Sequence, residues 1–118
     1  MKKISEYLKV QSIDLDLKSK DKKAILKELF EKLENCKEVT NKEKCYEDLL
    51  EREKLGSTGI GEGFAIPHAK STGVSELIMA VGISKEPIEY EAVDGKPVNI
   101  FFMFLSPNEL SQEYLILL

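Results

Sequence analysis

Two stretches of this chain carry apolar side chains on both faces of an extended backbone. They are residues 76–84, ELIMAVGIS, and residues 97–106, PVNIFFMFLS. A strand with one solvated face alternates apolar and polar residues, so strands that are apolar at both alternating positions indicate the centre of a sheet covered on two sides. Asp94-Gly95 forms a turn signal between the two stretches, which allows them to pair as antiparallel strands. We therefore expect a mixed central sheet.

Two helices are expected before these strands. Residues 19–36 place their apolar side chains on one helical stripe, with Ser19 as the expected N-cap. A second helix opens at Thr40, where the sequence TNKE has the form of a capping box. Arg52 falls in the last turn of that helix, and Gly56 is a natural residue for its end.

The two ends of the chain complete the expected fold. Residues 12–17, SIDLDL, alternate apolar and acidic residues as a half-buried strand does. Residues 108–118, NELSQEYLILL, begin another helix and end in an apolar run without a cap. This order predicts the α/β class, as a three-layer α/β/α sandwich with a mixed sheet. We expect residues 1–118 to be one domain that lacks its C-terminal helical part.

The charge and composition exclude several function classes. The formal net charge is -4, and the lysines are mixed with acids along the helical stretches, so no nucleic-acid surface is expected. No apolar run approaches the roughly 20 residues that cross a bilayer, which predicts a cytoplasmic protein. Cys36 and Cys45 form no CxxC pair, and we expect two reduced thiols and no metal site.

The only histidine of the chain, His68, lies in GSTGIGEGFAIPHAK, residues 56–70. The glycines match neither GxGxxG nor GxxxxGK[ST], and both of those motifs lead from a strand into a helix, the reverse of the order expected here. Ser57 stands in no GxSxG elbow, and nothing specific supports a histidine-assisted serine. One histidine with scattered acids provides no cluster of metal ligands.

His68 can itself act as a phosphoryl acceptor. A neutral imidazole nitrogen can attack phosphorus in line and then pass the group on. Backbone amides of the glycine loop and the Thr58 hydroxyl would hold the phosphoryl oxygens, and Arg52, the only arginine, would offset their charge. Each residue also has a plain alternative: His68 as an idle loop residue, Arg52 as a charge favoured at a helix end, and Thr58 as a turn former. The residue chemistry leaves both interpretations open.

A longer match adds to this chemistry. LLEREKLGSTGIGEGFAIPHAK, residues 49–70, closely resembles the active-site segment of the fructose/mannitol-type enzyme IIA domain of the bacterial phosphoenolpyruvate-dependent sugar phosphotransferase system, including that family's nitrogen-related regulatory branch. The resemblance continues through PIEYEAVDGKPVNIFFMFLSP, residues 87–107, which is similar to the family's strand-turn-strand. It covers nearly the whole chain.

The resemblance implies a phosphocarrier. His68 matches the phosphorylated histidine, which takes its phosphoryl group from phosphohistidine on HPr and passes it to a cysteine of an enzyme IIB domain. Arg52 matches the arginine near that histidine. No cofactor, nucleotide or metal takes part, and the role is compatible with association with a membrane enzyme IIC without direct membrane insertion. The family fold is an α/β/α sandwich with a mixed sheet, in agreement with the pattern of the sequence.

The chain departs from the family at Tyr114, in SQEYLILL. The family usually has a second histidine at this position, inside the helix that follows the last central strand. A tyrosine hydroxyl can donate a hydrogen bond to a phosphoryl oxygen, but it carries no charge near neutral pH. The alternative role of Tyr114 is that of an ordinary helix residue packed on the sheet.

Three functions follow for comparison. The first is a phosphocarrier in sugar uptake, and the second is a regulatory protein whose phosphorylation at His68 controls partner binding. The third is a fold relative without phosphoryl chemistry, which would have a buried His68 ring. The sequence gives neither the sugar nor the ring nitrogen that would accept the phosphoryl group.

Overall fold

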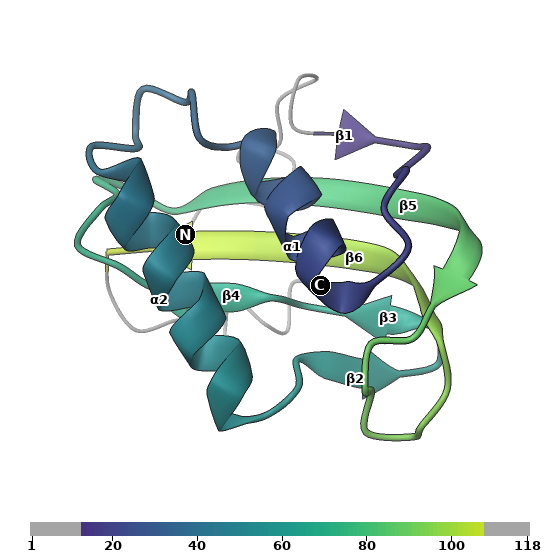
Figure 1. The fold of residues 1–118 in the computed structure, drawn as a ribbon. Coiled ribbons are helices and arrows are strands. Elements are labelled where there is room, and N and C mark those ends of the chain that lie inside the picture. The colour runs from purple at the N-terminus through teal and green to yellow at the C-terminus, as the bar shows by residue number, and fades with distance from the viewer. Residues whose placement is uncertain (1–12, 108–118) are drawn as a thin grey trace.

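A mixed sheet of six strands forms the centre of the computed structural model, which describes residues 13–107 (Figure 1). Its strands are β1 (Ile13–Asp14), β2 (Gly59–Gly61), β3 (Phe64–Ala65), β4 (His68–Lys70), β5 (Ile78–Ile88) and β6 (Val98–Ser106). They lie in the order β1-β5-β6-β3-β2, and β4 pairs with the later part of β6. β5 and β6 are antiparallel, whereas β1 on β5, and β3 and β4 on β6, are parallel. The predicted mixed sheet is confirmed.

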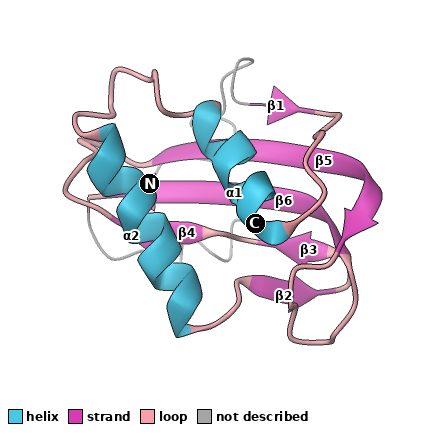
Figure 2. Ribbon diagram, in the orientation of Figure 1, coloured by secondary structure: helices cyan, strands magenta, loops and turns pink. Residues whose placement is uncertain are grey.

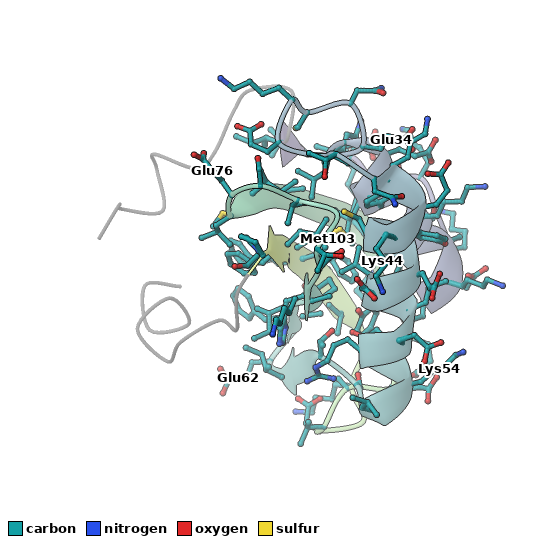
Figure 3. The ribbon with its side chains drawn as sticks, turned by 90° about the vertical axis from the view of Figure 1, so that its left-hand side faces the viewer. Glu34, Lys44, Lys54, Glu62, Glu76 and Met103 are labelled. Atoms are coloured by element: carbon teal, nitrogen blue, oxygen red, sulfur yellow. The ribbon has the colours of Figure 1, made fainter. Side chains whose placement is uncertain are left out.

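Helices α1 (Lys22–Glu31) and α2 (Lys42–Leu55) both cover the same face of this sheet (Figures 1 and 2). The side view in Figure 3 shows α2 along one side of the sheet, with Lys44 and Lys54 on it and Glu62 on the other side of the molecule. The helix predicted for residues 108–118 lies outside the described residues.

The strands β5 and β6 occupy the central positions predicted for them, and each has buried residues on both faces. A Cβ atom added to Gly82 would come within 2.7 Å of Leu29 in α1, so Gly82 and its pairing partner Phe101 lie on the helix-covered face. Met79 and its partner Phe104 lie on the opposite face, where they are 1% and 2% exposed. Side chains alternate between faces along a strand, so the two-sided apolar pattern corresponds to burial on two sides.

The first helix begins later than predicted. Asp21, and not Ser19, caps α1, because the Asp21 carboxylate accepts a hydrogen bond of 2.9 Å from the Ala24 N–H. Ser19 lies before the helix, where its own N–H donates to the Glu28 carboxylate at 2.9 Å. The backbone at Ser19 is therefore held by a side chain of the helix and does not start it.

This assignment predicts a stability difference between two neighbouring substitutions. Asp21→Ala should lower the free energy of unfolding by about 1 kcal/mol, the usual effect of losing an N-cap oxygen. Asp21→Asn should retain most of it, and Ser19→Ala should stay within about 0.5 kcal/mol of the parent protein. Urea unfolding followed by circular dichroism measures all three, and a larger loss for Ser19→Ala than for Asp21→Ala would contradict the assignment.

The second helix also starts one residue later than predicted. Asn41 is the N-cap of α2, and its side-chain oxygen accepts a hydrogen bond of 3.1 Å from the Lys44 N–H. The predicted capping box at Thr40 is wrong, because the Thr40 N–H donates to the Gly73 carbonyl at 2.8 Å. The end of the helix agrees with the prediction, with Arg52 in the last turn and Gly56 as the C-terminal cap.

The first strand is shorter than predicted. Residues 12–17 were expected to form one half-buried strand, but β1 ends at Asp14. The Asp14 carboxylate accepts a hydrogen bond of 2.9 Å from the Asp16 N–H, which turns the chain in the manner of an Asx turn. Leu15 is consequently 65% exposed, whereas Leu17 is buried against α1 and β5.

Candidate functional site

The glycine-rich stretch forms a β-hairpin. β2 and β3 are antiparallel and are joined by Glu62 and Gly63, with φ angles of 55° and 85°. Positive φ at both central residues is the requirement of a type I′ hairpin turn, and glycine meets it without steric cost. The Gly59 N–H donates to the Ser57 hydroxyl at 3.0 Å. That amides of this loop hold phosphoryl oxygens stays a prediction.

Gly59 allows the hairpin to lie against the loop between β5 and β6. A Cβ atom at this position would lie 2.8 Å from both Cα and Cβ of Ala92 and 3.1 Å from the Tyr90 ring. The Gly59 carbonyl also accepts a hydrogen bond of 2.9 Å from the Val93 N–H. Because the nearest atom is backbone, a side chain here would push the two segments apart.

Gly59→Ala should therefore destabilise the protein by about 1–3 kcal/mol, the range found for overpacked interiors. Ile60→Ala is the matched control, since the Ile60 side chain is 57% exposed on the adjacent position of β2. We expect the control to change the free energy of unfolding by less than about 0.5 kcal/mol. Equal effects of the two substitutions in urea unfolding would show that the close approach to Ala92 carries no weight.

His68 lies at the start of β4 and points away from the helices. It pairs in register with Phe104 of β6, and cross-strand partners project from the same face of a sheet. Phe104 is on the face opposite α1, so the His68 ring is on that face too. The residue is half-buried, and the Pro67 carbonyl before it accepts a hydrogen bond of 2.9 Å from the Phe104 N–H. A fully buried ring, expected of an inert fold relative, is not observed.

The His68 ring has a defined orientation. Its Nδ1 atom lies 2.7 Å from the Ile66 carbonyl oxygen. A carbonyl can only accept, so Nδ1 carries the proton and donates it, and Nε2 of the neutral ring keeps its lone pair. The geometry therefore places the free lone pair of the neutral ring on Nε2.

The other predicted site residues make hydrogen bonds that do not involve this ring. The Arg52 guanidinium donates to the Gly56 carbonyl at 2.9 Å, which satisfies an oxygen just past the end of α2. Thr58 is 3% exposed, and its hydroxyl donates to the Glu53 carboxylate. Tyr114 lies outside the described residues.

A buried polar cluster, missed by the sequence analysis, surrounds Thr58. We call it the Glu53 cluster; its members are Lys22, Glu53, Thr58 and Tyr90. One carboxylate oxygen of Glu53 accepts from the Thr58 hydroxyl and from the Tyr90 hydroxyl, the latter at 3.1 Å. The other accepts from Lys22 Nζ at 2.9 Å and from the Thr58 N–H at 3.3 Å. The Glu53 side chain is 7% exposed, so this carboxylate is buried with four donors around it.

Tyr90 is the most buried member of the Glu53 cluster. It is 0% exposed, its ring packs edge-on against Phe101 with centroids 5.6 Å apart, and Lys22 Nζ lies 4.7 Å from its ring centroid. Burial, and then the neighbouring Glu53 charge, raise the pKa of the Tyr90 hydroxyl far above its usual range. The hydroxyl therefore keeps its proton at physiological pH and can donate it to Glu53.

Two further properties concern the described residues as a whole. Within residues 13–107, no three histidine, cysteine or acidic side chains gather in a way that could hold a metal ion. In the same range, no helix has the length and apolar character that crossing a membrane requires.

A comparison with protein-family models shows to which family the chain belongs. The family model described as "Phosphoenolpyruvate-dependent sugar phosphotransferase system, EIIA 2" matches residues 6–118. This chain belongs to the EIIA 2 family. The resemblance stated for residues 49–70 and 87–107 is thus confirmed over almost the entire length.

Relatives of this EIIA 2 chain include sugar-specific and regulatory proteins. It is 36% identical over 113 residues to the fructose-specific EIIABC component of Bacillus subtilis, which covers 96% of this chain and 18% of that protein. It is 45% identical over 73 residues to a nitrogen regulatory protein of Pseudomonas aeruginosa, covering 62% of this chain and 47% of that protein. The chain thus spans less than half the length of either relative.

Solved structures agree with the α/β fold. The nitrogen regulatory protein IIA-Ntr from Neisseria meningitidis matches with a TM-score of 0.85 and 38% identity, over 96% of this EIIA 2 chain and 77% of that one. The mannitol IIA of Escherichia coli matches with a TM-score of 0.78 at 20% identity, over 92% of this chain and 78% of that one. The latter likeness concerns the fold alone.

Proposed function

We propose that this EIIA 2 chain is a phosphocarrier in the cytoplasm, in which His68 accepts a phosphoryl group from phosphohistidine on HPr and passes it to a cysteine of an enzyme IIB domain. The observation that carries the proposal is the orientation of the His68 ring, with Nδ1 bonded to the Ile66 carbonyl and Nε2 left as the nucleophile. The family supports this role, and mannitol IIA of Escherichia coli has been solved in complex with phosphorylated IIB.

The transfer needs no group beyond the two proteins. Nε2 attacks the phosphorus in line, and the new N–P bond forms as the N–P bond of the donor breaks, with its electron pair returning to the donor imidazole. The Nδ1 proton stays hydrogen-bonded to the Ile66 carbonyl, which stabilises the positive charge that develops on the ring. In the second step a cysteine thiolate forms an S–P bond as the Nε2–P bond breaks, and the electron pair of that bond returns to the His68 ring, which becomes neutral again.

Arg52 is proposed as the charge partner of the phosphoryl group. Its guanidinium has five N–H donors, and the hydrogen bond to the Gly56 carbonyl occupies one of them. Thr58 was predicted as a direct phosphoryl ligand. Its burial and its hydrogen bond to Glu53 favour a different role, in which Thr58 fixes the loop that leads into the hairpin. Tyr114 stays a candidate second ligand.

Labelling tests the proposal directly. The protein is incubated with phosphoenolpyruvate, enzyme I and HPr, and we expect one acid-labile, base-stable phosphoryl group per chain. In ¹⁵N-labelled protein, phosphorus should couple to Nε2 and not to Nδ1. No label, or a label bound through Nδ1, would contradict the proposed chemistry.

A second function has support of its own. The 45% identity to a nitrogen regulatory protein, and the fold match to IIA-Ntr, favour a regulatory protein whose phosphorylation at His68 changes which surfaces dock beside it. The discriminating measurement is the second transfer step. Passage of the label to a purified enzyme IIB cysteine supports the carrier in sugar uptake, whereas a labelled protein that keeps its phosphoryl group with every enzyme IIB of its host supports the regulatory role.

A further inference from the structure

The Glu53 cluster is linked to the His68 ring by a continuous chain of hydrogen bonds. Glu53 holds Thr58 at two points, its hydroxyl and its N–H. The Thr58 carbonyl accepts a hydrogen bond of 3.0 Å from the Ile66 N–H, and the Ile66 carbonyl lies 2.7 Å from His68 Nδ1. The backbone groups of Thr58 and Ile66 thus connect the buried Glu53 carboxylate, on the helix-covered side, to the His68 imidazole on the other face of the sheet.

From this connection we infer that Glu53 is a positioning residue for phosphoryl transfer, which acts through Thr58 and Ile66 to hold the His68 ring with Nε2 facing the donor. The expected effect on phosphoryl transfer rests on the proposed function. The expected effect on the orientation of the His68 ring does not, because that orientation exists in the unphosphorylated protein.

The composition of the cluster suits this role. Burying a carboxylate is costly unless it is paired and hydrogen-bonded, and Glu53 has both Lys22 and two hydroxyl donors. The cluster holds Thr58 in place, because moving Thr58 would remove two of the four donors from a buried charge. Tyr90 adds rigidity, since its ring is held by Phe101.

The neighbours of Thr58, Ser57 and Gly59, are hydrogen-bonded to the loop between β5 and β6, which contains Tyr90. The Ser57 hydroxyl donates to the Tyr90 carbonyl at 3.2 Å, and the Gly59 carbonyl accepts from the Val93 N–H at 2.9 Å. The residue on each side of Thr58 is therefore attached to the β5–β6 loop. The Ile66 N–H then meets a Thr58 carbonyl whose position is set on both sides.

Glu53→Gln is the test, because it keeps the volume of the side chain and replaces one acceptor oxygen by an amide that can only donate. At least two of the four donors then lose their acceptor. Glu51→Gln is the matched control: it is the same change two residues earlier on α2, at an exposed carboxylate that pairs with Lys54 at 3.0 Å. Both variants are measured in the full chain.

Three readouts are compared between the two variants. The single histidine gives one pair of ring ¹⁵N signals, and we expect Glu53→Gln to shift them from the Nδ1–H tautomer toward a mixture. Hydrogen exchange of the Ile66 amide should accelerate by about 10-fold or more, because Thr58, which carries its acceptor, loses its hydrogen bonds to the charged Glu53. The Leu17 amide, which donates to Ile83 near the β1 edge of the sheet, should keep its rate, whereas a general loss of stability would accelerate both.

The kinetic readout is phosphoryl uptake from phospho-HPr. A misplaced nucleophile should lower kcat by up to about 100-fold, while KM for phospho-HPr stays within about twofold because the docking surface is unchanged. Glu51→Gln should leave kcat as it is. If Glu53→Gln and Glu51→Gln give the same ring signals and the same Ile66 exchange, the inference is wrong.

A second pair of variants covers the case in which Glu53→Gln does not fold. Thr58→Val keeps the shape of the side chain without its hydroxyl and should reproduce the changes, whereas Thr58→Ser should restore the ring signals and kcat. Failure of Thr58→Ser to restore them would also overturn the inference. Absence of labelling in the parent protein would refute the proposed function alone, since the ring signals and amide exchange still decide whether Glu53 orients His68.

Discussion

Replacing His68 by alanine should reduce labelling by phospho-HPr to the background of the assay, a loss of about 1,000-fold or more, as expected when a nucleophile is removed. The chain has one histidine, so no second imidazole can take over the phosphoryl group. The loss should appear in kcat, because the nucleophile contributes to the reaction and not to docking of the donor. Radioactive labelling, with retention of the fold checked by circular dichroism, measures it.

His68→Asn separates the chemistry from the local structure. The asparagine side-chain amide can still donate to the Ile66 carbonyl, in the place of Nδ1, but it has no atom equivalent to Nε2. We expect this variant to fold as the parent protein does and to be as inactive as His68→Ala. Labelling of His68→Asn at the parental level would place the acceptor elsewhere in the chain and would remove the basis of the proposed function.

The two central strands could be predicted from the sequence, because they follow from the pattern of apolar residues within each strand. The strands β5 and β6 are apolar at successive positions, which is typical of strands in a sheet covered on two sides. The turn at Asp94-Gly95 set their antiparallel order, and the Gly95 N–H indeed donates back to the Ala92 carbonyl at 2.9 Å. The position of Arg52 at the end of α2 followed from helical periodicity in the same way.

The N-cap residues of the two helices could not be predicted from the sequence, because tertiary contacts determine which of several suitable residues caps each helix. Ser19 and Asp21 are both good N-cap residues, and the choice is made by Glu28, whose carboxylate engages the N–H groups of Lys18 and Ser19. At Thr40 the N–H is taken by Gly73, a residue more than 30 positions away.

The candidate site was found only in part for a similar reason. His68 and Arg52 were candidates from residue chemistry and were favoured by the resemblance over residues 49–70, but the tautomer of the ring depends on a backbone carbonyl two residues before the histidine. Glu53 looks like one more solvated acid in the sequence EREKL. Its carboxylate is hydrogen-bonded to Tyr90, which lies 37 residues further along the chain, and no local pattern reports that pairing.

The largest stability effect is expected at Phe101. Phe101→Ala should lower the free energy of unfolding by about 3–5 kcal/mol, through lost burial and the cavity left behind. The side chain is 0% exposed in the middle of β6 and packs edge-on against Tyr90. Since a domain of this size has a total stability of about 5–15 kcal/mol, a large share of it would be lost. Urea unfolding monitored by circular dichroism measures the difference.

Phe64→Ala is the matched control for Phe101→Ala. Phe64 is also a strand phenylalanine in an aromatic pair, with Phe102 at 6.4 Å between centroids, but it is 36% exposed. We expect its substitution to cost less than half as much, because less apolar area returns to water and no closed cavity forms. Phe101 also supports Tyr90, so the milder Phe101→Leu should loosen the Glu53 cluster and accelerate Ile66 amide exchange while the fold persists. Equal losses for Phe101→Ala and Phe64→Ala would mean that the helix-covered face of the sheet is not the main core.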